Sequence, residues 1–182
     1  MTPESPLRSL VEQASKGLPE KDGVVLRPDG LKYLTPVRAG AFLGLVRAGS
    51  VLADQLSGEL EAEHRLTLRE FEVLLFLAVF ASEGTLRMSQ LAEQAPLSQS
   101  RMSRLVDQLE TCGLVERAPD NQDRRGVTVA ITPKGIEKFT AAQETHLAGL
   151  ERLLFSHLTD REIQQLAKIT EKIVDACRTG DG

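Results

Sequence analysis

The chain has 182 residues, of which 41% are apolar and 26% charged, and its formal net charge is −4 at pH 7. This length and apolar content allow one packed core with appendages, while the acidic balance excludes a general coat for nucleic acid, which would be basic throughout. The two cysteines, Cys112 and Cys177, form neither a disulfide framework nor a zinc-ligand pattern, so we expect no metal and no other cofactor.

Residues 1–34 differ from the rest of the chain because prolines and glycines interrupt them at short intervals. A short helix is predicted within Pro6–Lys16, and the sequences KDGVV and RPDGL predict turns. We interpret this segment as an N-terminal arm whose role stays open, with a partly ordered tail as the alternative.

Thr35 and Pro36 predict the start of a long helix that runs to about His64, because a capping residue precedes a proline at the first helical position. Glycine weakens a helix by about 1 kcal/mol relative to alanine, so packing against another helix must support this one. The glycines concerned are Gly40, Gly44, Gly49 and Gly58.

Thr67–Glu70 reads as a capping box, which predicts a central apolar helix ending near Ala81. Its apolar run Val73–Ala81, the longest of the chain, is too short to span a bilayer. The first residues also lack the pattern of a signal peptide. We therefore expect a cytoplasmic protein without membrane contacts.

The sequence in the middle of the chain predicts a strand and two short helices, the second of which ends at a glycine. The strand is Thr85–Arg87 and the first helix is Met88–Gln94. Ser98 caps the second helix, which runs to about Thr111, and Gly113 ends it in the position that glycine prefers after a helix.

Two further strands, Leu114–Ala118 and Val127–Ile131, enclose a polar loop that is too long for a tight hairpin and suits a projecting wing. Thr132 and Pro133 then predict a helix to about Leu158. A second capping box follows, and the last helix extends from about residue 160 to 178.

These elements predict a mainly α fold, a winged helix-turn-helix whose N- and C-terminal helices form a dimerisation domain. Residues 35–66 and 133–178 are assigned to dimerisation and 67–132 to DNA binding. The terminal helices are apolar on more than one face, which favours burial against a second copy of the chain. An intrachain core is the alternative.

The order of helix, turn, helix, strand, charged loop and strand is typical of a DNA-binding domain. Glutamine and arginine recognise base edges, a helix N-terminus attracts phosphate, and arginine on a loop suits the minor groove. Which residues touch bases and which touch phosphates stays open, and solvated surface charge is the alternative. The expected DNA-binding residues are Ser98, Gln99, Ser100, Arg101, Ser103 and Arg104 from the helix and Arg124 and Arg125 from the loop, with Asp123 supporting the wing.

Three motifs in this order resemble the MarR family of bacterial regulators. Residues 109–117 read LETCGLVER, residues 120–125 read DNQDRR, and residues 131–135 read ITPKG, in which Ile131 replaces the usual leucine. The resemblance covers about Thr35 to Arg178 and leaves out the arm.

The resemblance implies a triangular homodimer on a pseudo-palindromic operator, with Ser98–Arg104 in the major groove and Arg124 or Arg125 in the minor groove. Many members repress a gene until a small aromatic or phenolic ligand binds. We therefore expect a ligand-responsive repressor of double-stranded DNA. Phe42, His64 and Phe71 are candidate ligand-binding residues, with plain core or surface roles as the alternative.

Two alternatives remain beside this hypothesis. Cys112 could make the chain a thiol-based redox sensor, since the nearby Arg117 would favour a thiolate. The winged helix could instead bind protein. An affinity for DNA that does not fall as salt rises would indicate this alternative. No catalytic triad, phosphate loop or paired acidic motif is present, so we do not expect an enzyme.

Overall fold

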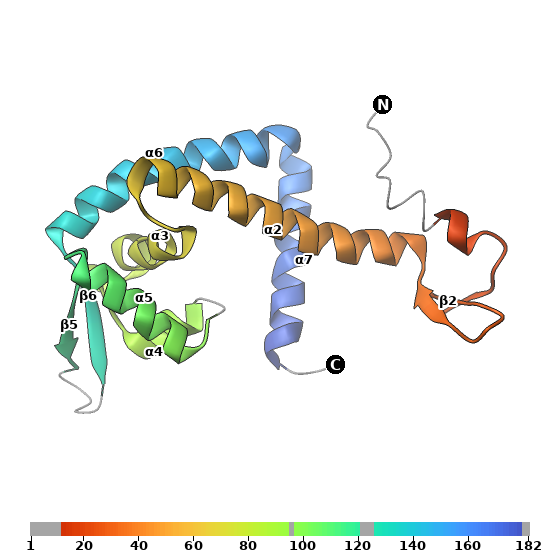
Figure 1. The fold of residues 1–182 in the computed structure, drawn as a ribbon, viewed down its shortest axis with the longest axis horizontal. Helices are drawn as coiled ribbons and strands as arrows, with labels where there is room; N and C mark the ends of the chain where they lie inside the picture. The colour runs from red at the N-terminus through yellow and green to blue at the C-terminus, as the bar shows by residue number, and fades with distance from the viewer. Residues whose placement is uncertain (1–11, 95–96, 121–125, 180–182) are drawn as a thin grey trace. The chain divides into compact units, whose positions relative to one another are not determined.

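The computed structural model describes residues 12–94, 97–120 and 126–179. These residues form two compact units, and the boundary between the units lies within one long helix, between Asp54 and Gln55. The described chain is mostly helical, with two antiparallel sheets of three strands each (Figure 1). None of its helices is both long and apolar enough to cross a membrane.

The arm contains a small antiparallel sheet, which was not among the predicted elements. Its strands are β1 (Glu20–Lys21), β2 (Val24–Leu26) and β3 (Lys32–Leu34). Asp22 and Gly23 connect the first two strands with φ values of 52° and 78°. A two-residue hairpin loop needs positive φ at both positions, and Asp-Gly meets that need at little cost. The turns predicted in the arm are thus confirmed.

Three contacts hold this sheet together and join it to helix α2 (Pro36–His64). The Val25 side chain is fully buried, and the Tyr33 hydroxyl donates to the Ala14 carbonyl at 2.8 Å. From the start of α2, Arg38 Nη1 donates to the Asp22 carbonyl at 2.6 Å. Strands of two or three residues carry too little alternation for a sequence pattern, so only the turns could be predicted.

Helix α2 begins and ends where the sequence predicts, and its first half carries several exposed large apolar side chains. Val37 is 78% exposed and Phe42 is 57% exposed. Four more large apolar side chains of this half are also exposed: Leu43, Leu45, Val46 and Val51. An apolar surface of this extent on a helix usually meets a partner.

Helix α3 (Leu68–Leu75) forms the centre of the second unit. The predicted capping box is confirmed, because Thr67 Oγ1 accepts from the Glu70 amide and Glu70 Oε2 accepts from the Thr67 amide. Phe71 is fully buried, with ring centroids 5.5 Å from Phe139 and 4.5 Å from His146. The predicted continuation to Ala81 is helical, but its last turn, Phe76–Phe80, is a π-helix.

The predicted winged-helix elements follow in order. They are β4 (Thr85–Arg87), α4 (Met88–Gln94), α5 (Gln99–Thr111), β5 (Val115–Pro119) and β6 (Val127–Ile131). The strands pair antiparallel in the order β4-β6-β5. In Figure 1, α4 and α5 lie together below α3, with β5 and β6 at one end. Leu91, Met102 and Val129 are fully buried and join these elements to one core.

Helix α6 (Pro133–Leu153) ends earlier than the predicted Leu158. Leu154 leaves the helical region with φ −130° and ψ −65°, and a single 3-10 turn follows. The second predicted capping box is confirmed, because Thr159 and Glu162 exchange hydrogen bonds at the start of α7 (Asp160–Thr179).

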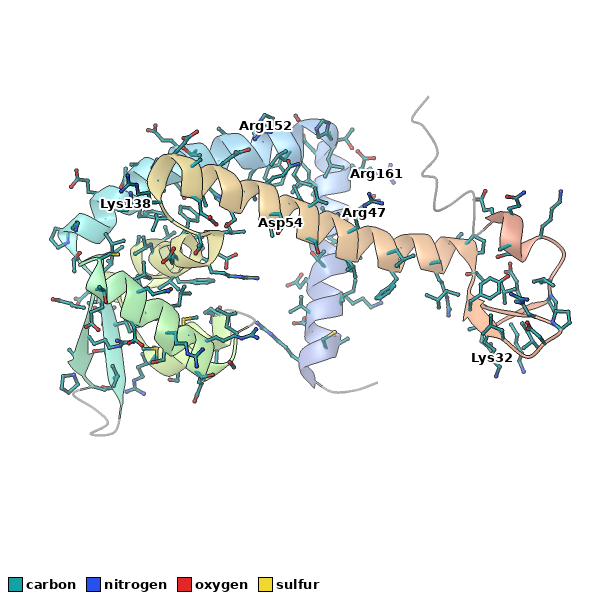
Figure 2. All side chains as sticks on the ribbon, in the orientation of Figure 1. Lys32, Arg47, Asp54, Lys138, Arg152 and Arg161 are labelled. Atoms are coloured by element: carbon teal, nitrogen blue, oxygen red, sulfur yellow. The ribbon has the colours of Figure 1, made fainter. Side chains whose placement is uncertain are left out.

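Polar pairs hold the end of α2 to α6. Arg152, labelled in Figure 2, lies on α6. It forms an ion pair with Glu59 of α2. The Thr145 hydroxyl donates to Glu63 at 2.7 Å, so the Nε2–H of His64 donates to Thr145 Oγ1 at 2.8 Å. These contacts fix the orientation of the His64 ring.

The turn at Cys112–Leu114 joins α5 to the wing and to α6. Gly113 has a φ of 70°, which glycine adopts without strain, and the Leu114 amide donates back to the Leu109 carbonyl at 2.9 Å. Gly135, on the first turn of α6, lies so close to the Leu114 carbonyl that a Cβ atom would overlap it.

This close approach predicts that Gly135→Ala lowers the free energy of unfolding by about 1–3 kcal/mol, the usual cost of overpacking. The control is Gly58→Ala on α2, where a Cβ would meet nothing within 4 Å. That variant should raise stability by about 0.5–1 kcal/mol, because alanine favours helix. Urea denaturation measures both, and equal effects of the two substitutions would contradict the packing assigned to Gly135.

His146, whose ring packs against Phe71 in a tilted arrangement, predicts a loss of stability in acid. Burial lowers the pKa of its imidazole, and the carboxylate of Glu72 offsets this only in part. The folded chain therefore binds fewer protons than the unfolded chain between the lowered pKa and the usual one. The folding stability that depends on a neutral His146 is fully present above the usual pKa, and it is lost as the pH falls through that window.

His146→Phe keeps a ring against Phe71 and cannot be protonated. When the pH is lowered from about 7.5 to about 5.5, we expect its melting temperature to fall by less than that of the wild type. The control is His157→Gln, at an exposed histidine, which should follow the wild type. An identical acid-induced loss in all three proteins would disprove the role of His146.

Candidate nucleic-acid interface

Helix α5 presents the predicted polar face to solvent. Met102, Val106 and Leu109 recur at helical spacing and are buried against the core. The opposite face carries Gln99, Ser100, Arg101 and Arg104, which are all exposed together with the preceding Ser98. Of the residues predicted to bind DNA from this helix, only Ser103 is half-buried.

The first turn of α5 is not capped by the side chain that precedes it. Ser98 occupies the predicted N-cap position, but the prediction that its side chain caps the helix is wrong. Its hydroxyl instead pairs with the Ser100 hydroxyl at 3.1 Å. Within the described residues, no N-cap side chain accepts from the amides of this first turn. Together with the helix dipole, these amides are suited to a phosphate oxygen.

Charge is unevenly distributed along α5. Arg101 and Arg104, in its first half, are exposed and form no ion pair with any residue in the described ranges. The acidic residues of the helix, Asp107 and Glu110, lie in its second half, where the single charge of Arg117 balances one of their two charges. The first half is therefore cationic and the second half keeps a residual negative charge.

Arg117, on β5, fastens the recognition helix to the wing. Its Nη1 atom lies 2.5 Å from Asp107 Oδ1 and 2.7 Å from Glu110 Oε2. Its Nη2 atom donates to the Ser103 carbonyl at 2.9 Å. Because Nη1 and Nη2 both bind acceptors on α5, Arg117 positions this helix.

The base of the wing is closed by Asp120. Its amide donates to the Gly126 carbonyl at 3.0 Å, and its buried carboxylate lies 2.6 Å from Arg87 Nε. The loop residues predicted to bind or support DNA contacts, Asp123, Arg124 and Arg125, lie outside the described residues.

The three residues predicted to bind a ligand have different surroundings. Phe71 belongs to the fully buried core, and Phe42 is exposed on the first half of α2. His64 lines a pocket of about 430 Å³ in the second unit, together with Cys112. Within the described part of the chain, no cluster of three or more histidine, cysteine or acidic side chains could hold a metal ion.

Sequence reasoning did not assign the structural roles of Arg87, Arg117 and Asp120. A signal existed for Arg117, because Asp107 and Glu110 are three residues apart on the exposed face of a helix that turns back at Gly113. No comparable signal existed for Arg87 and Asp120, which meet only because β4 and β5 both pair with β6.

Comparison with known proteins agrees with this geometry. The family model described as MarR family matches residues 65–126. The HTH-type transcriptional repressor MdtR of Bacillus subtilis is 32% identical over 108 residues, which are 59% of this chain and 69% of MdtR.

Two solved structures from Streptomyces coelicolor share the fold. AbsC, a MarR family transcriptional regulator, is 27% identical with a TM-score of 0.77, over 82% of this chain and 99% of AbsC. Sco3205, a MarR family transcriptional regulator solved in complex with DNA, is 26% identical with a TM-score of 0.76, over 79% of this chain and 90% of Sco3205.

Replacing the guanidinium of Arg117 should loosen the recognition helix. We expect Arg117→Met to lower the free energy of unfolding by about 1–2 kcal/mol, since charged hydrogen bonds to several acceptors are lost. The control is Arg69→Met, which removes an exposed ion pair with Glu72 one turn away and should cost about 0.5 kcal/mol at most. Thermal and urea denaturation measure both, and an Arg117 variant no weaker than the control would refute the proposed fastening.

Proposed function

The chain belongs to the MarR family, and we propose that it is a transcription repressor that binds double-stranded DNA through α5 and the loop between β5 and β6. The observation that carries this proposal is the cationic first half of α5. Arg101 and Arg104 are exposed there, form no ion pair within the described residues, and lie beside a helix N-terminus that the Ser98 side chain does not cap. MdtR, whose name describes a repressor, and Sco3205, solved with DNA, support it.

The charge distribution of α5 suits an approach to DNA with its N-terminus first. Gln99, Arg101 and Arg104 then face the major groove, where glutamine suits adenine and arginine suits guanine. Ser98, Ser100 and Ser103 have hydroxyls that can donate to phosphate oxygens. The second half of the helix, which carries Asp107 and Glu110, stays at a distance from the phosphates. Arg124 or Arg125 enters the minor groove, with Asp123 as support.

We propose that the working form is a homodimer on a pseudo-palindromic operator. The first half of α2 exposes a series of apolar side chains, and α7 exposes another. On α7 these are Leu166, Ile169, Ile173 and Val174, of which Ile169 is 56% exposed. Burying both surfaces against a second copy removes them from water, and a two-fold axis places two recognition helices about one DNA turn apart.

A small ligand completes the proposed function by lowering affinity for the operator. His64 supports this part, because it lines a pocket that also contains residues from the end of α5. Phe42 and Phe71 stay predictions as ligand-binding residues. A ligand regulates only if it binds the two states of the protein with different affinity.

Operator binding should depend on the two arginines of α5. With DNA selected from a random pool, we expect Arg101→Ala and Arg104→Ala each to lower affinity about 10-fold or more, as for the loss of a base or phosphate contact. The wild type should also lose affinity steeply as salt rises, because binding releases counterions from the phosphates. Gel-shift titration at several salt concentrations measures both effects.

The matched control is Arg161→Ala, at an exposed arginine on α7 (Figure 2), which should bind as the wild type does. Wild-type affinity for the selected DNA in both α5 variants would disprove the assignment of α5 as the recognition helix. Failure to select any DNA in a salt-sensitive manner would instead favour a winged helix that binds protein.

A further inference from the structure

A pocket of about 380 Å³ lies in the second unit, away from the polar face of α5. Its walls come from three elements: the π-helical turn that follows α3, strand β4 and helix α4. The volume lies within the range of small-molecule sites, roughly 300–1,000 Å³. The residues that line this pocket, which we call the π-turn pocket, are Phe76, Phe80, Leu86, Gln90, Glu93 and Gln94.

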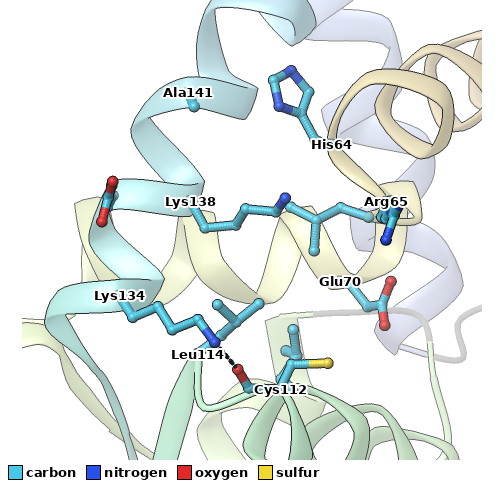
Figure 3. A pocket seen from close by; sticks show the side chains of 11 residues that line it. His64, Arg65, Glu70, Cys112, Leu114, Lys134, Lys138 and Ala141 are labelled. Carbon is cyan, nitrogen blue, oxygen red and sulfur yellow. Dashed lines mark hydrogen bonds between the residues drawn. The ribbon is translucent and has the colours of Figure 1, made fainter.

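The charge of the π-turn pocket is opposite to that of the pocket lined by His64. Figure 3 shows Arg65, Lys134 and Lys138 at the His64 pocket, where they supply positive charge. Among the described residues that line the π-turn pocket, Glu93 alone is charged. Its side chain is exposed and has no ion-pair partner in the described part of the chain. Because this carboxylate is unbalanced, the pocket favours a cation.

Two phenylalanine rings form the apolar wall of the pocket. The ring centroids of Phe76 and Phe80 lie 6.0 Å apart, and the ring planes are tilted by 46°. Phe80 is 68% exposed, so a ligand placed against it removes apolar surface from water. The face of a phenyl ring also attracts a cation, because the ring quadrupole is negative there. The aromatic wall and Glu93 therefore favour a ligand of the same charge.

The end of α4 favours positive charge as well. Glu93 lies in the last turn of this helix, which carries no basic side chain. The C-terminal end of a helix dipole is negative, so a cation there offsets both the dipole and the carboxylate. Gln90 is held at this wall, because its Oε1 atom accepts from the Arg87 amide at 2.9 Å.

The backbone beside the pocket adopts uncommon conformations. Phe76–Phe80 is a π-helical turn, a form that is rare and that recurs at functional sites. Glu83, between this turn and β4, has φ 55° and ψ 26°, the left-handed region that a residue other than glycine seldom adopts. Such conformations cost stability, and proteins keep them mainly where a site depends on them.

We propose that the π-turn pocket binds a small organic cation, an amine or a quaternary ammonium on an aromatic body. The aromatic body lies against Phe76 and Phe80, and the cationic group pairs with Glu93. This site goes beyond the proposed function and does not rest on it, because none of its residues belongs to the set proposed to bind DNA.

Calorimetric titration of the full chain, without DNA, tests the site with 1-naphthylmethylamine, its N,N,N-trimethyl derivative and the uncharged 1-naphthylmethanol. We expect at least one of the cations to bind about 5-fold more tightly than the alcohol, from the ion pair and the ring faces together. The two cations decide between an amine and a quaternary ammonium. Glu93→Gln should reduce the preference to about 2-fold, the part that the rings provide.

Phe80→Ala should weaken the cations and the alcohol alike, by about 5-fold, because it removes apolar wall. The matched control is Glu171→Gln, at an exposed glutamate on α7, which should bind all three compounds as the wild type does. Melting curves verify that each variant is folded. If Phe80→Ala does not fold, Glu93→Gln decides alone.

Three outcomes would each overturn the π-turn pocket as a cation site: no binding of either cation, equal affinity for the cations and the alcohol, or an unchanged preference in folded Glu93→Gln. Wild-type affinity in folded Phe80→Ala would also overturn it. Because no DNA enters these titrations, their failure leaves the proposed function untouched, and failure of the chain to bind DNA leaves the cation site intact.

Discussion

The three backbone carbonyls of Cys112, Gly113 and Leu114 are all satisfied from the start of α6. Lys134 Nζ binds the first, the Thr132 hydroxyl binds the second, and the Thr132 amide binds the third, at 2.8, 2.8 and 3.1 Å. The recognition helix ends in these residues and the wing begins there, so α6 determines the position of both. The absent side chain of Gly135 allows this close approach.

The same turn explains how an acidic chain can present a cationic surface. Beyond Gly113 the chain reverses, which brings Arg117 back over the second half of α5, where it pairs with Asp107 and Glu110 and balances one of their two charges. The two arginines of the first half have no ion-pair partner among the residues that the structure describes. Local geometry therefore determines which part of the helix is cationic, and the net charge of the whole chain does not.

Sequence patterns predicted the parts of this fold that depend on neighbouring residues. Capping at Thr67 and Thr159, the stop at Gly113 and the inward face of α5 all follow from short-range rules. The sheet of the arm, the pairing of Arg87 with Asp120 and the occupied carbonyls of the turn depend on residues far apart in the chain. Ser98 shows that such short-range rules can fail even within one helical turn. Its hydroxyl could pair with a backbone amide of α5 or with the Ser100 hydroxyl, and it pairs with Ser100.

The small sheet of the arm has a consequence for protein engineering. Among the described residues its strands pair with one another, and Arg38 and Tyr33 anchor it through contacts within residues 14–38. The turn at Pro28–Gly30 is exposed and belongs to the first compact unit, whereas α5 belongs to the second. Exposed turn tips of this kind tolerate insertions. This turn is therefore a suitable place for an epitope or a fluorophore that reports on the protein without altering its recognition helix.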